Sequence, residues 1–408
     1  MSDSKYSLSG FSSVAIHSGH EDDGNHAHLT PIYASSTYLF DTAEQGMKRF
    51  NGEEKGYIYS RWGNPTMNEA EQKISALESF QLKNNQNGNL ELKTILHSSG
   101  MSALSSLLLG TLKTGDKILT HFSLYGGSQE LMEKLLPEFG IEAVIVDLRD
   151  LNKAESALKA DPAIKMLYLE TPANPTIQCV DIDELSKLGK QYNLIVSVDN
   201  TFATPFLQQP FKYNVDYVFH STTKFLNGHG TAIGGALVGR DIEKMEGRMT
   251  KVHRLLGGNS NPFDAFLLTQ GMKTLEVRME RHCNNAVEVA NFLQSHPAIE
   301  KVNYLGLESH PDHKTGLKQM RHPGAMLSFE LKGGLLSGKK FINKLQMCVR
   351  AVSLGTCDTL LSHPASMTHF GVPKEKREQY GITDGLVRMS VGIENVADIL
   401  NDVDQALK

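Results

Sequence analysis

The chain has 408 residues, a formal net charge of −5 and a composition that is 40% hydrophobic and 21% charged. This length favours two domains over one, and the composition is typical of a globular protein with a large core. The acidic balance and the lack of a dense Lys/Arg block argue against nucleic acid or an anionic membrane as a partner. A small-molecule partner is therefore expected.

Targeting and membrane signals are weak. The longest apolar stretches, such as Ala103 to Leu112, fall well short of the ~20 residues that a membrane-spanning helix needs. The opening MSDSKYSLSG lacks the apolar core of a signal peptide. The four cysteines are scattered without CxxC spacing and are expected to be free, buried thiols. Together these features predict a cytoplasmic protein.

The N-terminal segment, residues 1–65, is rich in Ser, His, Gly and Tyr and shows little hydrophobic periodicity. We expect an extended arm here rather than a separate domain. Arms of this kind usually pack on a neighbouring subunit.

Residues 66–270 alternate between helical stretches and short apolar runs, which predicts a mainly parallel central sheet with helices on both faces. The expected strands are 94–98, 116–122, 142–147, 164–170, 194–199 and 215–221, and the expected helices lie near 101–113, 126–137, 150–160 and 181–192. A long helical pattern over 262–294 leads to VNYLG, AMLSFELKG, RAVSLG and VRMSVG. We therefore predict a smaller C-terminal α/β domain over 271–408.

Polar motifs follow the predicted strands, at the sheet edge where α/β proteins bind ligands. They are SSGMSA (98–103), LYGG (124–127), ETPANP (170–175), VDNTF (198–202) and HSTTKF (220–225). Each is a weak signal alone. Together they offer a helix N-terminus for a phosphate, a carboxylate, an aromatic ring and a lysine amine. Pyridoxal phosphate (PLP) requires all four, so this cofactor is predicted.

The same motifs carry a family resemblance that runs from about residue 10 to the C-terminus. YSRWGNPT, SSGMSA, YGG, ETPANP, VDNT, HSTTKFLNGHG, HPASMTH and GLVRMSVGIE are similar to the motifs of the Cys/Met-metabolism PLP enzymes, the trans-sulfuration family. The resemblance implies the type I fold of PLP-dependent transferases, which is aspartate aminotransferase-like.

The resemblance also implies catalytic roles. Lys224 would bind the cofactor covalently and later carry protons as a free amine. Asp199 would pair with the pyridine nitrogen and keep it protonated. Tyr125 would stack on the ring and protonate the departing γ-group.

Further roles are implied for binding residues. The cofactor phosphate would be held by Gly100, Met101, Ser221, Thr223, Tyr59 and Arg61. In the family the last two come from a neighbouring subunit, which implies an obligate dimer, usually assembled as a tetramer. Arg388 would clamp the substrate carboxylate, Asn174 would bind the cofactor's 3′-oxygen, and Ser353 would orient the substrate or the lysine.

Three positions bear on the reaction, and they disagree. Val352, before Ser353, resembles methionine γ-lyases, whereas members that handle cystathionine usually have Glu there. Gly127 stands where those lyases typically have Cys, and HGTAIGG resembles O-acetylhomoserine sulfhydrylases. We predict γ-elimination from methionine or homocysteine to 2-oxobutanoate, ammonia and a thiol. The alternatives are γ-replacement on an O-acylhomoserine, as in O-acetylhomoserine sulfhydrylase or cystathionine γ-synthase, and cystathionine γ-lyase activity.

Other functions are disfavoured by the local sequence. GGLLSGKK (333–340) fits a P-loop except that Lys340 stands where a Ser or Thr would bind Mg²⁺. HPDH (310–313) lacks accompanying ligands and is expected to be a solvated loop, so no metal is predicted. An aminotransferase on the same fold and a non-catalytic nucleotide-binding protein remain as alternatives.

Overall fold

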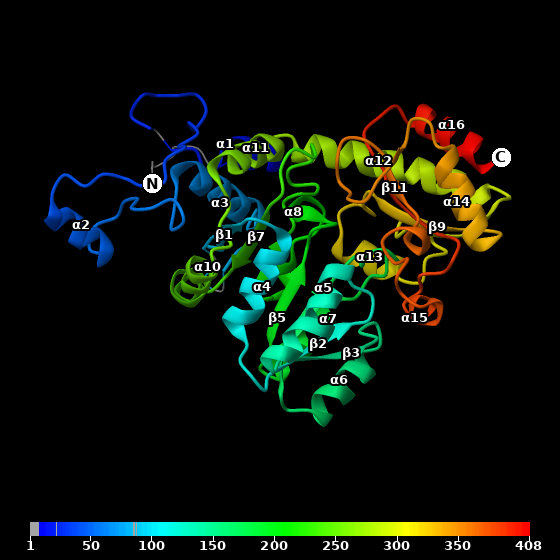
Figure 1. Cartoon of the computed structure of the whole chain (residues 1–408), viewed down its shortest axis with the longest axis horizontal. Helices are drawn as coiled ribbons and strands as arrows, with labels where there is room; N and C mark the ends of the chain where they lie inside the picture. Colours follow the sequence, from blue (N-terminus) through cyan, green and yellow to red (C-terminus); the bar gives the residue numbers. More distant parts are fainter. Residues whose placement is uncertain (1–7, 22, 85, 87) are drawn as a thin grey trace.

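The computed structural model describes residues 8–21, 23–84, 86 and 88–408. Within this part of the chain a larger sheet has seven strands in the order β1-β7-β6-β5-β4-β2-β3, and a smaller sheet has five in the order β10-β11-β12-β9-β8. The two sheets lie in different parts of an elongated molecule (Figure 1). The fold is α/β, as the sequence predicts.

The larger sheet is mixed. Its strands are β1 (Lys93–His97), β2 (Lys117–His121), β3 (Glu142–Val146), β4 (Ile164–Glu170), β5 (Ile195–Asp199), β6 (Tyr217–His220) and β7 (Gly235–Gly239). Strands β3, β2, β4, β5 and β6 pair in parallel, and β7 runs antiparallel to both of its neighbours, β1 and β6.

The smaller sheet contains β8 (Ile299–Asn303), β9 (Met326–Leu331), β10 (Val349–Arg350), β11 (Leu360–Ser362) and β12 (Leu386–Ser390). Its pairs are antiparallel except β10 with β11.

The helices that surround the larger sheet are α3 (Pro65–Glu78), α4 (Gly100–Thr111), α5 (Gly126–Glu130), α6 (Leu151–Ala160), α7 (Ile182–Gln191), α8 (Thr204–Leu207), α9 (Ile242–Lys244), α10 (Thr250–Leu256) and α11 (Pro262–Met272). Shorter turns of π or 3-10 helix cover Leu131–Leu135, Leu136–Phe139, Pro210–Tyr213 and Met245–Met249. The C-terminal part adds α12 (Leu275–Ser295), α13 (His313–Gln319), α14 (Gly334–Lys344), a 3-10 turn at Pro364–Ser366, α15 (Lys374–Gln379) and α16 (Val396–Leu407).

Strand β4 shows why a nearly continuous apolar run becomes a central strand. Successive side chains of a strand point to opposite faces of the sheet. Leu167 and Leu169 enter the hydrophobic core on one face, and Met166 and Tyr168 enter the core on the other. Both faces are therefore covered by helices, and the carboxyl end of β4 is left as the place where polar groups can gather.

Helix α12 joins the two parts of the chain. Its first half contributes Leu275 and Met279 to the core of the larger sheet. Its second half contributes Val289 and Leu293 to a separate core under the smaller sheet. One rigid helix thus fixes where the C-terminal part lies against the strand ends.

Two expectations need correction. The pattern over 262–294 forms two helices, α11 and α12, rather than one, because Arg278 donates to the carbonyl oxygen of Gly271 at 2.8 Å and stabilises the break. Strand β7 was not predicted. Glycines lie at both of its ends, and a Cβ atom at Gly235 would come within 2.1 Å of the Ser99 carbonyl oxygen.

The structure also differs from two expectations for the C-terminal part. Of the segment RAVSLG (350–355) only Arg350 lies in a strand, which it forms with Val349, and Leu360–Ser362 forms a strand that was not predicted. His310 and Asp312 are buried instead of lying in a solvated loop, because the Asp312 carboxylate accepts a hydrogen bond from the Cys179 amide.

The cysteine prediction is confirmed in most of its detail. All four thiols are free, and Cys179, Cys283 and Cys348 are buried, while Cys357 is half-buried. Among the described residues no helix has the length and apolar composition needed to cross a membrane.

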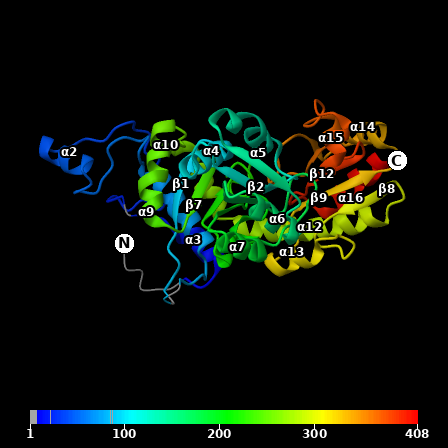
Figure 2. The ribbon, with the colours of Figure 1, turned by 90° about the horizontal axis from the view of Figure 1, so that it is seen from below.

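The described part of the N-terminal segment contains two short helices. Helix α1 (Phe11–His17) packs on its own chain, where the Phe11 ring contacts the rings of Phe80 and Phe206. Helix α2 (Ala43–Phe50) instead projects from the body of the molecule in both views (Figures 1 and 2).

Candidate functional site

The carboxyl ends of the parallel strands bring the predicted motifs together. Glu170, the last residue of β4, pairs in register with Asp199, the last residue of β5. Asp199 in turn pairs with Phe219 of β6, which places the turn that carries Lys224 beside it. Parallel strands end at one edge, so groups far apart in sequence meet there.

Lys224 lies in the turn after β6, and its Nζ donates a hydrogen bond to Ser353 Oγ at 2.8 Å. Burial and the nearby charge of Arg388 lower the pKa of Lys224 to about 8. Ser353 adopts a left-handed backbone with φ of 84°, which is uncommon for a residue other than glycine. The lysine is therefore held by the C-terminal part of the chain and is less basic than a solvated lysine.

Arg388, on β12, is buried and reaches across to the same edge. Its Nη1 donates to Asn174 Oδ1 at 3.1 Å, and its Nη2 donates to the Ser353 carbonyl oxygen at 2.6 Å. Its Nε is buried and has no hydrogen-bond partner among the described residues. A guanidinium with a free donor in a buried position can bind a carboxylate.

Two carboxyl groups lie side by side at this edge. Asp199 accepts a hydrogen bond from the Thr201 amide at 3.0 Å, and Glu170 accepts bonds from the amides of Tyr125 and Asn174. Burial raises the pKa of both carboxyl groups. A cation placed beside Asp199 would stabilise its ionised form.

Helix α4 begins where a phosphate could bind. Ser99 caps the helix by accepting a hydrogen bond from the Ser102 amide, and Gly100 is its first residue. A Cβ atom at Gly100 would lie 2.9 Å from Ser221 Cβ, so only glycine lets the helix terminus approach the turn after β6. Thr223 Oγ1 lies at the same turn and exchanges hydrogen bonds with the backbone of Gly234. Met101 occupies the first turn of the helix.

Tyr125 is the residue that precedes α5, and its side chain is 49% exposed. A Cβ atom at Gly127 would lie 2.6 Å from Tyr125 Cε1 and 3.2 Å from Met101 Sδ. The present position of the phenol ring thus depends on glycine at 127.

Tyr59 and Arg61 make contacts within the N-terminal half of the chain and with α10. The Arg61 guanidinium lies over the Tyr59 ring at 5.5 Å, and its Nη1 donates to the Arg254 carbonyl oxygen at 2.6 Å. The structure brings Lys224, Ser353, Arg388 and Asn174 together, whereas none of the contacts recorded for Tyr59 or Arg61 among the described residues joins that group.

Glu170 and Thr201 are site residues that sequence reasoning missed. Both stand inside quoted motifs, ETPANP and VDNTF, but only the neighbouring residues were given roles. The signal for Glu170 was an acid that ends an otherwise apolar strand. Thr201 Oγ1 accepts a hydrogen bond from the Ser221 amide at 2.9 Å and thereby joins two strand ends.

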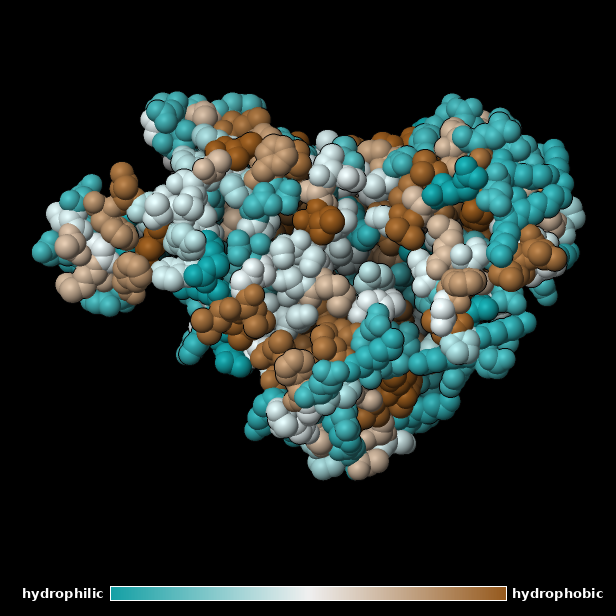
Figure 3. Space-filling view, in the orientation of Figure 1, coloured by the Kyte–Doolittle hydropathy of each residue, from teal (hydrophilic) through white to brown (hydrophobic). Residues whose placement is uncertain are grey.

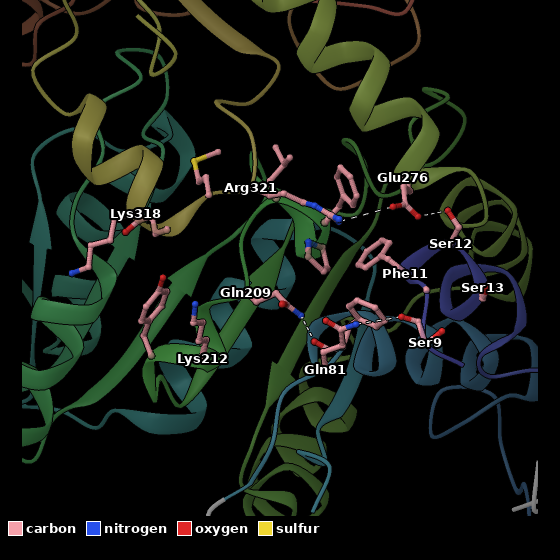
Figure 4. Close-up of a pocket in the computed structure, with 18 residues that line it drawn as sticks. Ser9, Phe11, Ser12, Ser13, Gln81, Gln209, Lys212, Glu276, Lys318 and Arg321 are labelled. Carbon is pink, nitrogen blue, oxygen red and sulfur yellow. Dashed lines mark hydrogen bonds and ion pairs between the residues drawn. The ribbon is translucent and has the colours of Figure 1, made fainter. Parts of the chain in front are cut away.

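A separate cavity of about 550 Å³ lies between α1, α12 and the segments that flank α8 and α13 (Figure 4). Of the cations that line it, Arg321 and Lys318 pair with Glu276 and Asp181 respectively, and Lys212 lies over the Tyr213 ring at 5.7 Å. None of the predicted site residues lines this cavity. The strand-end site is therefore the better candidate for catalysis.

The strand-end groups fit PLP in charge and shape. The ionised form of the buried Asp199 carboxyl group would be stabilised by a nearby cation, and a protonated pyridine nitrogen is such a cation. The N-terminus of α4, which Gly100 lets approach the turn after β6, suits a phosphate. A lysine with a pKa of about 8 suits attachment to an aldehyde. Together with the α/β fold, these features define a PLP-dependent enzyme.

Comparison with known proteins identifies the family of PLP-dependent enzymes to which the chain belongs. Residues 12–408 match the Cys/Met metabolism PLP-dependent enzyme family, and the chain belongs to that family. It is 47% identical over 401 residues to an L-methionine gamma-lyase of Fusobacterium nucleatum subsp. nucleatum, with 98% of each chain covered.

Two further relatives extend the comparison. An L-methionine gamma-lyase of Porphyromonas gingivalis is 44% identical over 400 residues, which cover 98% of this chain and 97% of the relative. The crystal structure of a cystathionine gamma synthase from Xanthomonas oryzae pv. oryzae aligns with a TM-score of 0.90 at 33% identity and covers 98% of both chains. The expected family, fold class and cofactor are thus confirmed.

Proposed function

We propose that the protein catalyses PLP-dependent γ-elimination of L-methionine or homocysteine, with water, to 2-oxobutanoate, ammonia and the corresponding thiol. The observation that carries the proposal is the full-length similarity to L-methionine gamma-lyases at 42% to 48% identity. The site agrees with it, because Val352 next to Ser353 presents an apolar, 55% exposed side chain. An apolar surface suits a thioether better than a charged distal group.

In this proposal the cofactor, when bound, withdraws electrons from the substrate's α-carbon and so makes its proton acidic. Asp199 holds the proton on the ring nitrogen, and Asn174 binds the 3′-oxygen. The amides of Gly100 and Met101 and the hydroxyls of Ser221 and Thr223 hold the phosphate.

The chain's own residues would then move the protons. The amine of Lys224 would take the proton from the α-carbon and pass it on to the bound cofactor. Neutral again, it would then take the proton lost from the β-carbon. Its lowered pKa supports this role, because a base is most effective when its pKa lies near the working pH. The phenol of Tyr125 gives a proton to the departing sulfur, and Arg388 and Ser353 hold the substrate's carboxylate.

We further propose a shared site in a dimer, assembled as a tetramer, in which Tyr59 and Arg61 reach the phosphate of a neighbouring subunit. The projecting segment around α2 supports this, since it exposes Leu39 (89%), Met47 and Phe50. Apolar residues cover much of this lobe at the left of Figure 3. Exposed apolar clusters of this kind usually mark an interface.

The dimer can be tested by mixing. Arg61→Ala and Lys224→Ala proteins, dissociated and reassembled together, are expected to recover part of the activity because mixed dimers contain one intact site. Mixing must be verified with differently tagged subunits. Verified mixed dimers without activity would overturn the shared site.

The second candidate is γ-replacement on an O-acylhomoserine or on cystathionine. Gly127 favours it, because that residue opens space beside Tyr125 where a bulkier side chain would not fit without moving the ring. The similarity in fold to a cystathionine gamma synthase is in keeping with it.

Product analysis separates the two reactions. The purified holoenzyme is incubated with methionine, cystathionine or O-acetylhomoserine, each with and without sulfide, with Lys224→Ala as the inactive control. We expect 2-oxobutanoate from methionine alone. Product that forms only when an acylhomoserine and sulfide are both present would refute γ-elimination.

We also propose a cytoplasmic location, in keeping with four free thiols.

A further inference from the structure

Glu170 is a buried side chain, 5% exposed, to which the mechanism above gives no role. Its two carboxylate oxygens accept hydrogen bonds from the Tyr125 amide at 3.0 and 2.8 Å. Oε1 also accepts a bond from the Asn174 amide at 3.0 Å. One carboxylate therefore binds the backbones of two separate site loops, the one after β2 and the one after β4.

The hydrogen bonds to Glu170 hold the backbone at residues whose side chains belong to the site. Tyr125 precedes α5, so its backbone determines where the phenol leaves the chain. The Tyr125 side chain itself is half exposed and receives little fixation from packing. A carboxylate that accepts several amide bonds in a buried place is a strong and directional anchor.

A continuous set of hydrogen bonds runs from Glu170 to the lysine. The Asn174 side chain accepts a bond from Arg388, and Arg388 donates to the Ser353 carbonyl oxygen. The Ser353 hydroxyl accepts a bond from Lys224. Glu170 thus sits between Tyr125 on one side and Asn174, Arg388 and Lys224 on the other.

We propose that Glu170 is a positioning residue that fixes the phenol of Tyr125 relative to Lys224 and Arg388 in the proposed reaction. It touches the backbones of site residues and not the substrate. A displacement of about 1 Å in a catalytic group can lower turnover by about 100-fold. Loss of the anchor should therefore lower kcat far more than it changes KM.

The principal variant is Glu170→Gln, which keeps the size of the side chain but places an amide NH₂ against backbone N–H groups. A matched control is Asp402→Asn. Asp402 is also buried and its carboxylate also accepts three backbone amides, those of Gln346, Met347 and Cys348, but it lies on α16 and binds the segment after α14. Both substitutions remove a buried carboxylate that accepts hydrogen bonds from backbone amides. Only Glu170 binds the backbone of residues in the site.

Besides the melting temperature, two measurements are made on both variants. The first is the circular dichroism of the cofactor band together with the Kd of the apoenzyme for PLP, which need no substrate. The second is kcat and KM. For Glu170→Gln we expect an altered cofactor band, a Kd several-fold higher and a kcat about 10- to 100-fold lower with KM within a few-fold. Asp402→Asn should lower the melting temperature and leave the band, Kd and kcat unchanged.

A double-mutant cycle then shows whether Glu170 acts through the phenol. If it does, Glu170→Gln should lower kcat much less in a Tyr125→Phe background than in the wild-type background. Equal losses in the two backgrounds, or an unchanged cofactor band and Kd, would overturn the inference. If Glu170→Gln does not fold, Glu170→Asp takes its place, because its shorter carboxylate cannot span both loops.

Different experimental results would contradict the proposed reaction and the proposed role of Glu170. A wild-type enzyme that does not form 2-oxobutanoate from methionine counts against the reaction, and kcat is then measured with O-acetylhomoserine and sulfide. The cofactor band and the Kd for PLP still test Glu170 in that case. A wild-type enzyme that is active while Glu170→Gln matches it in every measurement counts against the inference alone.

Discussion

Arg388→Lys offers a quantitative test of how the substrate carboxylate is bound. Arg388 is buried, two of its nitrogens are used by Asn174 and Ser353, and its Nε has no partner among the described residues. A lysine ammonium cannot keep both of these bonds and still present a planar pair of donors to a carboxylate.

The expected magnitude follows from the bonds lost. A hydrogen bond to a charged group contributes about 1.5 to 3 kcal/mol, and each 1.4 kcal/mol is about tenfold in an equilibrium constant. We therefore expect KM for methionine to rise roughly 10- to 100-fold. The carboxylate is bound in the ground state and the transition state alike, so kcat should change much less.

The pH dependence of this variant has a defined sign. Burial lowers the pKa of Arg388 to about 10, so the guanidinium remains charged at neutral pH. A lysine starts from a lower pKa and would be partly neutral in the same environment. KM of the variant is therefore expected to rise further as the pH is raised, while KM of the wild type stays nearly constant.

The assay is 2-oxobutanoate formation over a range of methionine concentrations. The matched control is Arg377→Lys, another buried arginine of the C-terminal part, which is paired with Asp384 at 2.7 Å. That control should lower thermal stability and leave KM unchanged. An unchanged KM in Arg388→Lys, or the same rise in both variants, would refute the assignment of Arg388.

Other perturbations test the remaining parts of the site. Because burial and Arg388 lower the pKa of Lys224 to about 8, kcat is expected to fall as the pH drops from about 9 to about 6, and a flat profile would count against a lysine base. Gly127→Val puts a branched side chain at this position, with its Cβ atom 2.6 Å from Tyr125 Cε1. It should therefore alter the dichroism of the cofactor band and lower kcat about tenfold, with little change in melting temperature. Glu78→Ala removes a fully buried contact with His220 Nε2 at 2.6 Å. Denaturant titration should show a free energy of unfolding lower by about 3 kcal/mol, and no loss of stability would mean that this contact contributes little.

Much of the sheet could be predicted because its strands are buried on both faces. The run IKMLYLE became β4 over the predicted residues, since period-2 alternation into two cores requires an apolar residue at almost every position. Strand β7 could not be found in this way. Glycine lies at both of its ends, and its place between β1 and β6 follows from pairing with strands distant in sequence.

For the site, the sequence by itself determined the chemistry. Lysine, aspartate, tyrosine and a glycine-led helix terminus after successive strands predict PLP, because the carboxyl ends of parallel strands meet at one edge. Only the tertiary structure decided how these groups are joined. Ser353 and Arg388 come from the C-terminal part, and α12 holds that part against the sheet so that Ser353 reaches Lys224. The role of Glu170 followed only from the tertiary structure, since its partners are backbone amides, and the position of a backbone amide depends on the fold and not on residue type.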